Sequence, residues 1–518
     1  MEDFFLQLSN LQIFNQFWIS IFIIISVVLI ARVFVTDTRY SPILLIVLFG
    51  LAMGYILVAS GVSHPGLPEF QIMDLVSKTT TIALSASFFV GGQELRKVFG
   101  KLKYEHENLI IHSKDFTSVG TNQTQFLFII RSFFLLLGIE TAFRAIVGVD
   151  DGPLTRFYPL LAYVGLAGSF VIMDHKSIVA DNKKHYIIRG LVETIAICLV
   201  LVVAYNISSW IRPLIALPQI FFVMIITCVL GAIFYKWAFG PTLSSLLFAG
   251  LPTVLAGSFL IGGSRISEAF SIDGMNSVLA FGFFGQLVWM FGGISLLIVF
   301  AKTAQVRNLA PGLAGGLSHS GLTGACNAGD LGEIAQFRAP IMINMPFLAH
   351  VFVFSILSLS AERGGLLMIP SLIVFAVGAG LTVWALKTLK SVETAESEEH
   401  IDSNETKSLM MFSLGWQLIA VFGSFILLSI LRMPLDHIAV AATSSLSHFG
   451  LFAATQGGMF GAEVVELLPF IFAMPFLVHP FVFFLFGRAM DRDGEMPNLP
   501  TFVLSGIGVL GIIFSALL

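Results

Sequence analysis

The sequence predicts an all-α polytopic membrane protein with about 13–14 transmembrane helices, internal repeats and broken or re-entrant helices. Composition is the first observation: of 518 residues, 56% are hydrophobic and 12% are charged, against about 25% charged in soluble domains. The mean hydropathy is +0.90. The second observation is a series of long apolar runs, and the third is a motif that occurs twice. A net charge of −4 offers no basic surface for nucleic acid.

Each apolar run is about 20 residues long, the length that an α-helix needs to cross a bilayer. None shows the alternating pattern of a lipid-facing β-barrel strand. The first 16 residues contain Glu2 and Asp3 but no lysine or arginine, so we expect no cleaved signal peptide. The runs cover residues 17–35, 41–60, 72–90, 126–149, 157–173, 187–206, 214–235, 243–261, 278–301, 340–359, 366–386, 409–431, 468–486 and 502–518.

Lysine and arginine gather in alternate loops, as the positive-inside rule requires of a polytopic protein. The loops near residues 60–71 and 150–153 contain neither. We therefore expect an integral protein of the bacterial inner (plasma) membrane with its amino terminus outside. The loop cations are Arg32, Arg39, Arg96, Lys97, Lys101, Lys103, Lys114, Lys176, Lys183, Lys184 and Arg189.

Two short motifs recur at one constant offset. Residues 317–322 (LSHSGL) match 446–451 (LSHFGL), and residues 345–350 (MPFLAH) match 474–479 (MPFLVH), each 129 residues further on. Glycine, proline and hydroxyl residues are typical of broken helices that line a substrate or ion path in secondary transporters. If residues 308–336 are re-entrant the units are inverted, and if they form a broken span the units are parallel.

These motifs supply the candidates for a substrate or ion path. They are Ser318, His319, Thr323, Asn327 and Asp330 in the first unit, and Ser447, His448 and Gln456 in the second. The alternative interpretation is that the small residues only let helices pack closely.

Charged residues inside apolar helices are costly and mark functional sites by default. Glu193 is the first candidate for a proton or cation carrier, although an ion pair with Arg189 at i−4 would also explain it. Glu140 and Arg144 are spaced i, i+4, which favours a neutralising pair on one helix face. Asp174 lies at the cytoplasmic end of its span, where it either guards an ion entry or marks the interface.

Residues 17–206 resemble the cation:proton antiporter superfamily, on three features. The first span ends in Ala31-Arg32, the second is a glycine-containing run at residues 43–55, and the third ends in Phe-Phe-Val-Gly-Gly-Gln-Glu. The third is similar to that family's F-x-x-G-x-E signature, on Phe89, Gly92 and Glu94. The stretch 161–203 continues the likeness.

The resemblance implies that Glu193 exchanges protons for Na⁺ or K⁺ beside a broken helix, with Asp174, Ser169 and Thr194 near the ion. Two features depart from the family pattern. No Thr-Ser-Pro or Thr-Asp-Pro stands around residues 169–174, and Glu193-Thr194 replaces the usual Asn-Asp or Asp-Asp pair. Both departures bear on the identity of the ion and on the stoichiometry.

Two other families share features with the chain. Sodium/glutamate symporters have a related architecture of inverted repeats, and the Gly/Ser/Thr-rich stretch 315–329 suits an anion held by amides and hydroxyls. Residues 444–448 are similar to part of the antiporter-like subunits of respiratory complexes. Those subunits use lysines inside their spans, and we expect no lysine in the middle of a helix here.

The sequence thus predicts a secondary active transporter that exchanges Na⁺ or K⁺ for protons by alternating access; the alternative is Na⁺-coupled symport of a small organic or inorganic anion. We expect no enzymatic activity, cofactor or metal centre. The expected partners are a monovalent cation, the proton, the lipid bilayer and, from the resemblance, a second copy of the chain. The expected divisions are an antiporter-like half (1–212), central helices (213–307), two repeat units (308–387 and 409–518) and an acidic loop between them (388–408).

Overall fold

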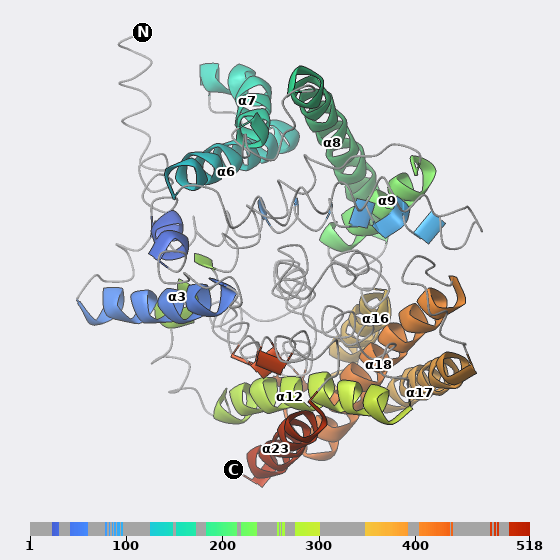
Figure 1. Ribbon diagram of the computed structural model, residues 1–518. Coiled ribbons are helices and arrows are strands. Elements are labelled where there is room, and N and C mark those ends of the chain that lie inside the picture. Colours follow the sequence, from blue (N-terminus) through green and yellow to red (C-terminus); the bar gives the residue numbers. More distant parts are fainter. Residues whose placement is uncertain are drawn as a thin grey trace.

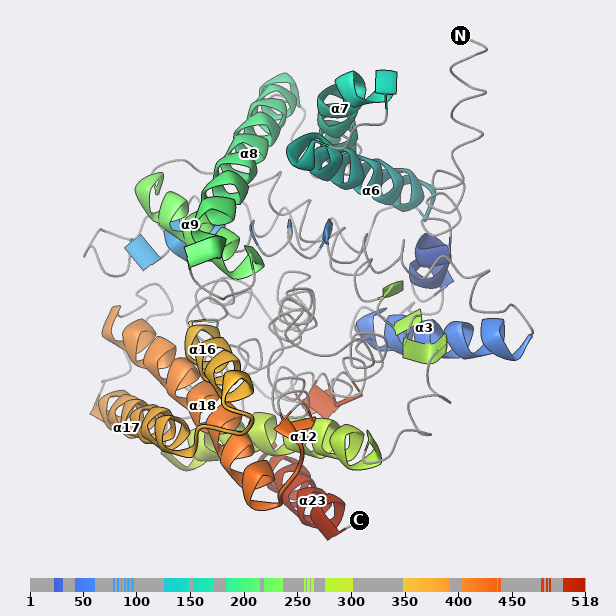
Figure 2. The ribbon, with the colours of Figure 1, turned by 180° about the vertical axis from the view of Figure 1, so that it is seen from behind.

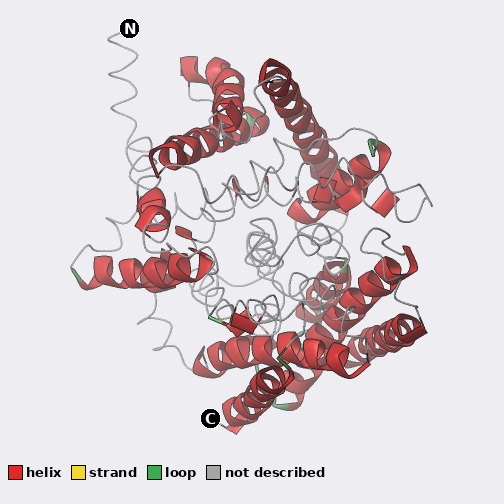
Figure 3. Cartoon of the chain, viewed as in Figure 1, coloured by secondary structure: helices red, strands yellow, loops and turns green. Residues whose placement is uncertain are grey.

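The described part of the chain is almost entirely helical and contains no strand (Figure 3). The computed structural model describes residues 23–30, 42–60, 78–79, 82, 85, 88–89, 91–93, 95–96, 125–148, 152–171, 183–214, 219–235, 256–257, 259–260, 262–264, 275–300, 348–391, 403–435, 437–438, 477–478, 481–482, 484–485 and 497–517.

The helices form two groups that lie on opposite sides of the molecule (Figure 1), and the view from behind shows the same division (Figure 2). The first group consists of α6 (Gln125–Val147), the 3₁₀ turn η2 (Gly152–Phe157), α7 (Tyr158–Val171), α8 (Lys183–Ile211), the 3₁₀ turn η4 (Arg212–Leu214) and α9 (Gln219–Ile233). The second group consists of α12 (Met275–Phe300), α16 (Ala349–Glu362), α17 (Met368–Ser391), α18 (Ser403–Ile430) and α23 (Asn498–Leu517). The helix α3 (Pro42–Ala59) lies between the groups.

Four described helices are long and apolar enough to cross a bilayer: Asn276–Phe300, Met368–Leu389, Lys407–Ile430 and Asn498–Ser515. Their outer faces carry large apolar side chains, such as Ile373 on α17 and Phe514 on α23, which are more than half exposed. Apolar surface of this extent is unfavourable in water and favourable against lipid. The helical fold is confirmed for the described residues, and these four helices support the predicted membrane character.

Helix boundaries differ from the predicted spans where polar helix-forming residues flank an apolar run. Helix α8 begins at Lys183 rather than at 187. Helix α17 continues to Ser391 and α18 begins at Ser403, so both reach into the polar segment that was expected to be a loop. Lysine and glutamate are good helix formers, and hydropathy does not register them. The acidic loop is therefore shorter than predicted, at both ends.

Glycines form the contacts between antiparallel neighbours. In the α6–α7 pair, Gly138 lies against Gly165, and a methyl group on either would overlap the backbone of the other helix. In the α17–α18 pair, Gly378 lies against Gly415 in the same way. Small residues permit this close approach, which lets membrane helices gain van der Waals contact.

Two further contacts join segments that are distant in sequence and run in the same direction. Gly50 of α3 lies against Ala256, and Gly54, one turn later, lies against Leu260. Phe89 lies against Gly231 of α9, and the Gln93 amide donates to the Phe234 carbonyl at 3.3 Å. Both pairs advance together along the chain, so both are parallel.

Helix α6 ends at a glycine in the left-handed conformation. Gly148 has φ 71° and donates its N–H to the Arg144 carbonyl at 3.0 Å. This is a C-cap that residues with a side chain adopt reluctantly. The chain reverses after this cap, and α7 runs antiparallel to α6.

Candidate functional site in the first helix group

A buried carboxylate stands between two cations in the first helix group. Glu140 Oε2 accepts from Lys78 Nζ at 2.7 Å, and Glu140 Oε1 accepts from Arg144 Nε at 2.8 Å. The side chain of Glu140 is 8% exposed, that of Lys78 17% and that of Arg144 23%. Each carboxylate oxygen therefore has its own cationic donor, as a charge in a low-dielectric interior requires.

The ion cluster lies at the end of the α6–α7 hairpin. The Arg144 guanidinium is 5.9 Å from the ring centre of Tyr158, the first residue of α7. The hydroxyl of Thr141 donates to the Leu137 carbonyl at 2.7 Å and so leaves the carboxylate to the cations. The cluster ties α6 both to α7 and to the segment that contains Lys78.

The predicted Glu140–Arg144 pair is confirmed, and Lys78, which was not predicted to take part, joins it. Lys78 is helical and its ammonium contacts a carboxylate 62 residues away. Hydropathy indicated its span, but no local spacing could indicate a partner so distant. Because Glu140 neutralises it, Lys78 does not resemble an uncompensated carrier lysine.

Glu193 lies within α8, ten residues after its first residue, or about 15 Å along the axis at 1.5 Å per residue. It precedes Ala204 by eleven residues, about three full turns. Ala204 is fully buried, as is Ser208 one turn further on. By helical register, position 193 therefore lies on the same face of α8 as Ala204.

The opposite face of α8 is directed outward. Ile188, Val192 and Leu199 are each 60% exposed, and they recur at the spacing of one helix face. Positions 189 and 193 are four residues apart and therefore lie on one face of α8. This spacing fits both interpretations of Glu193, as carrier or as partner of Arg189.

Helix α8 is held against its neighbours near its carboxyl end. The Gln219 amide at the start of α9 donates to Ser208 Oγ at 3.2 Å and to the Tyr205 carbonyl at 3.4 Å. The Tyr205 ring meets Phe143 of α6 edge to face, with centres 6.3 Å apart. The buried face of α8 is thus fixed relative to α6 and α9.

Ser169, another predicted ion-site residue, is buried on α7 with its hydroxyl unpartnered among the described residues. Ser132 of α6 is buried and unpartnered in the same sense. Phe134 contacts Gly168 across the hairpin, so the two serines lie at a similar level. Helices α7 and α8 are in contact, which places Ser169 on a neighbour of the helix that carries Glu193 and Thr194.

The other predicted site residues lie outside the described part of the chain. They are Asp174, Ser318, His319, Thr323, Asn327, Asp330, Ser447, His448 and Gln456.

A buried polar group in the second helix group was not among the predicted site residues. Gln286 of α12 is fully buried, and neither amide atom has a hydrogen-bond partner among the described residues. One turn later, the Trp289 carbonyl accepts from Trp416 Nε1 of α18 at 2.6 Å. A buried amide without partners costs about 1–3 kcal/mol. This makes Gln286 a candidate for the path of a polar solute.

Within the described residues, no group of three or more His, Cys, Asp or Glu side chains is placed to hold a metal ion. Cys198 and Cys228 are free thiols. Comparisons of the chain with protein-family models, with curated proteins and with solved structures found no match.

Proposed function

We propose that this protein is a secondary active transporter that exchanges Na⁺ or K⁺ for protons across the membrane, with Glu193 as the group that binds each in turn. The observation that carries the proposal is the register of α8. Glu193 lies about 15 Å into a 29-residue helix, at a position whose register matches that of the buried Ala204. An acidic residue inside a membrane helix bundle is a functional candidate by default.

Glu140, the other buried acid, fits a structural role better than a carrier role. Its two oxygens already accept from Lys78 and Arg144. A cation would have to displace both donors to reach the carboxylate. In the proposal Glu193 binds the ion, and Glu140 holds the α6–α7 hairpin, against which α8 packs.

Burial supports the internal repeat of the proposed architecture. Residues 129 positions apart have similar exposure: Phe352 is 47% and Phe481 41% exposed. Val353 and Val482, the next pair, are both buried. Two such units are the usual construction of a transporter that alternates between two faces.

The parallel pairs support the proposed alternation of crossings. Successive spans cross the membrane in opposite directions, so two spans that run in the same direction have an odd number of other spans between them in the chain. Five predicted spans lie between α3 and the segment at 256–264, and three lie between the segment at 88–96 and α9. The proposal also includes about 13–14 spans, a bacterial inner membrane, an external amino terminus and a homodimer.

In the proposed cycle, the Glu193 carboxylate is open to one side of the membrane at a time. On one side it releases a proton and binds the cation, and on the other it releases the cation and is protonated. Because one carboxylate holds either partner but not both, the two fluxes are coupled in opposite directions. The water-excluding faces of α6, α7 and α9 around α8 would prevent leakage.

Reconstituted vesicles that contain a pH-sensitive dye test the proposal. External NaCl or KCl should raise the internal pH, because each entering cation is exchanged for a proton. Glu193→Gln should abolish the rise, and Glu193→Asp should retain part of it. Asn206→Ala serves as a control on the exposed face of the same helix and should transport at the wild-type rate. A wild-type rate in Glu193→Gln would overturn the proposal.

The same vesicles distinguish the alternative, Na⁺-coupled anion symport. Radiolabelled glutamate and phosphate are supplied outside with and without Na⁺. Na⁺-dependent uptake of either anion, without an accompanying rise of internal pH on addition of NaCl alone, would replace exchange by symport.

A further inference from the structure

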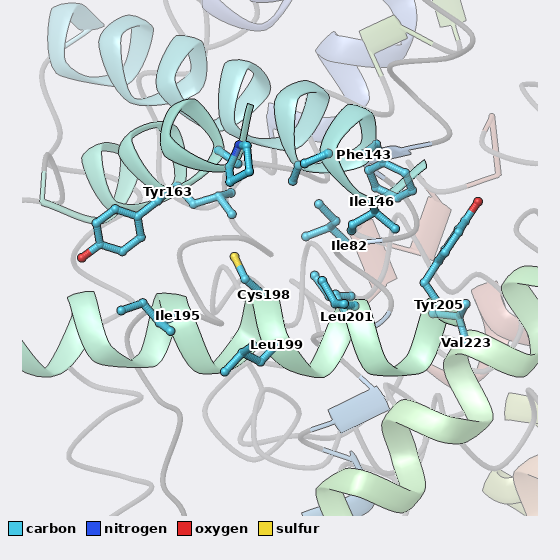
Figure 4. Close-up of a pocket in the computed structure, with 16 residues that line it drawn as sticks. Ile82, Phe143, Ile146, Tyr163, Ile195, Cys198, Leu199, Leu201, Tyr205 and Val223 are labelled. Atoms are coloured by element: carbon cyan, nitrogen blue, oxygen red, sulfur yellow. The ribbon is translucent and has the colours of Figure 1, made fainter. Parts of the chain in front are cut away.

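An apolar cavity of about 360 Å³ lies between the α6–α7 hairpin and α8. Figure 4 shows Tyr163 and Ile195 toward one end, Phe143 and Tyr205 toward the other, and the Cys198 sulfur directed from α8 toward the hairpin. Its lining is almost entirely carbon. Water gains few hydrogen bonds in such a space.

The cavity has a buried floor and an exposed edge. Leu166, Leu201 and Val223 of the lining are buried, whereas Leu199 is 60% exposed and Ile195 is about half exposed. The exposed residues belong to the outward face of α8 described above. The cavity therefore opens sideways, toward the surface that a membrane protein presents to lipid.

We propose that this cavity binds one acyl chain of a bilayer phospholipid. The inference rests on the membrane location in the proposed function and is independent of the transported ion. A cavity that opens into the hydrocarbon region and cannot satisfy water is filled by hydrocarbon, because lipid tails are the surrounding solvent there.

The chemistry of the lining favours a lipid tail over a protein segment. A protein segment brings polar N–H and C=O groups that an almost entirely carbon lining can satisfy only if they are already paired in a helix, which is about 10 Å across with its side chains. An extended hydrocarbon chain is much thinner than a helix and has no polar group, so it suits a cavity of about 360 Å³ with this lining.

One exposed cationic side chain is close in sequence to the lining of the cavity. Pro159 of the lining follows η2, whose Arg156 is exposed and has no ion-pair partner among the described residues. Arg156 is therefore available to a phosphate at the membrane interface. Asp150 and Asp151 precede it in the sequence, which favours a zwitterionic headgroup over an anionic one.

The test uses the full-length chain in phosphatidylcholine vesicles that contain a minor fraction of phosphatidylcholine with a diazirine in the middle of one acyl chain. After irradiation and digestion, mass spectrometry locates the adducts. The proposal predicts adducts on the buried Leu166 and Leu201 as well as on the exposed Leu199. Adducts confined to exposed residues, such as Leu199 and Val192, would overturn it.

A pair of variants on α7 gives the control. Ala162→Phe fills the cavity and should reduce adducts at Leu201 several-fold, whereas Val164→Phe, on the exposed face of the same helix, should leave them unchanged. Ala145→Phe fills the cavity from α6 and replaces Ala162→Phe if that variant does not fold. Equal labelling of Leu201 in the filled and control variants would contradict the proposal.

A second copy of the chain is the competing occupant. Benzophenone attached to Cys198, in a chain that carries Cys228→Ser and Cys326→Ser, shows which molecule occupies the cavity. Cross-links to lipid support the proposal, and cross-links between two copies of the chain would assign the cavity to a dimer contact and overturn it.

Discussion

The Lys78 ammonium and the Glu140 carboxylate lie 2.7 Å apart, although 62 residues separate them in the chain. Their contact joins two helical segments within an apolar bundle. Arg144 completes the cluster from the next turn of α6. Stability at this point therefore depends on electrostatics, in a protein whose interior is otherwise mainly hydrocarbon.

We expect Glu140→Gln to lower the free energy of unfolding by about 3 kcal/mol, because it leaves two cations largely buried without a counter-charge. Thermal or denaturant unfolding in detergent measures the loss. Arg363→Gln, which removes an exposed charge, should change stability little. The double variant Lys78→Met, Glu140→Gln should lose less than the sum of the two single losses. Additive losses would show that the contact contributes nothing.

We expect Gly165→Leu to destabilise the α6–α7 pair by more than about 3 kcal/mol, since any side chain there meets the backbone of Gly138. Gly380→Ala is the control. No atom lies near its Cβ position, and alanine should stabilise the helix by about 0.5–1 kcal/mol. Changes of equal sign in the two variants would argue against close packing at Gly165.

We expect Gln286→Met to raise the free energy of unfolding by about 1–2 kcal/mol, because it removes a buried amide that lacks partners. If Gln286 lies on the transport path, the same variant should transport more slowly. Gln219→Met, which removes hydrogen bonds to Ser208 and Tyr205, should instead be less stable. A less stable Gln286→Met would mean that the amide is satisfied.

We expect Arg96 and Arg156, both exposed, to face opposite sides of the membrane, because α6 crosses between them in the proposed topology. In a chain without its native cysteines, a membrane-impermeant maleimide should label Arg156→Cys in intact cells. It should label Arg96→Cys only after permeabilisation. Labelling of both variants from outside would contradict the proposed topology.

Hydropathy and charge spacing were sufficient to predict the helices and the pair within α6. An apolar run of membrane length has few alternatives to a helix, and residues four apart on a helix meet. Hydropathy fails to give the helix bounds at α8, α17 and α18, where polar helix-forming residues extend the helix beyond the apolar run.

The candidate site likewise combines residues that the sequence indicates with residues that it does not. Glu193 is conspicuous in the sequence as a charge among apolar residues, and its register on α8 required the buried positions at Ala204 and Ser208. Lys78 as a partner of Glu140 and the unsatisfied amide of Gln286 gave no local signal, because each depends on residues far along the chain.

Composition and the length of the apolar runs are enough to predict a helical membrane protein and to single out its few charged residues and repeated motifs. Which helices are neighbours, which of them run parallel and where a cavity remains become known from the three-dimensional arrangement. The physical reason is that hydropathy and helix formation are local and additive, whereas the choice of neighbours depends on matching surfaces. A glycine opposite a backbone and a lysine opposite a carboxylate become visible only when distant segments meet.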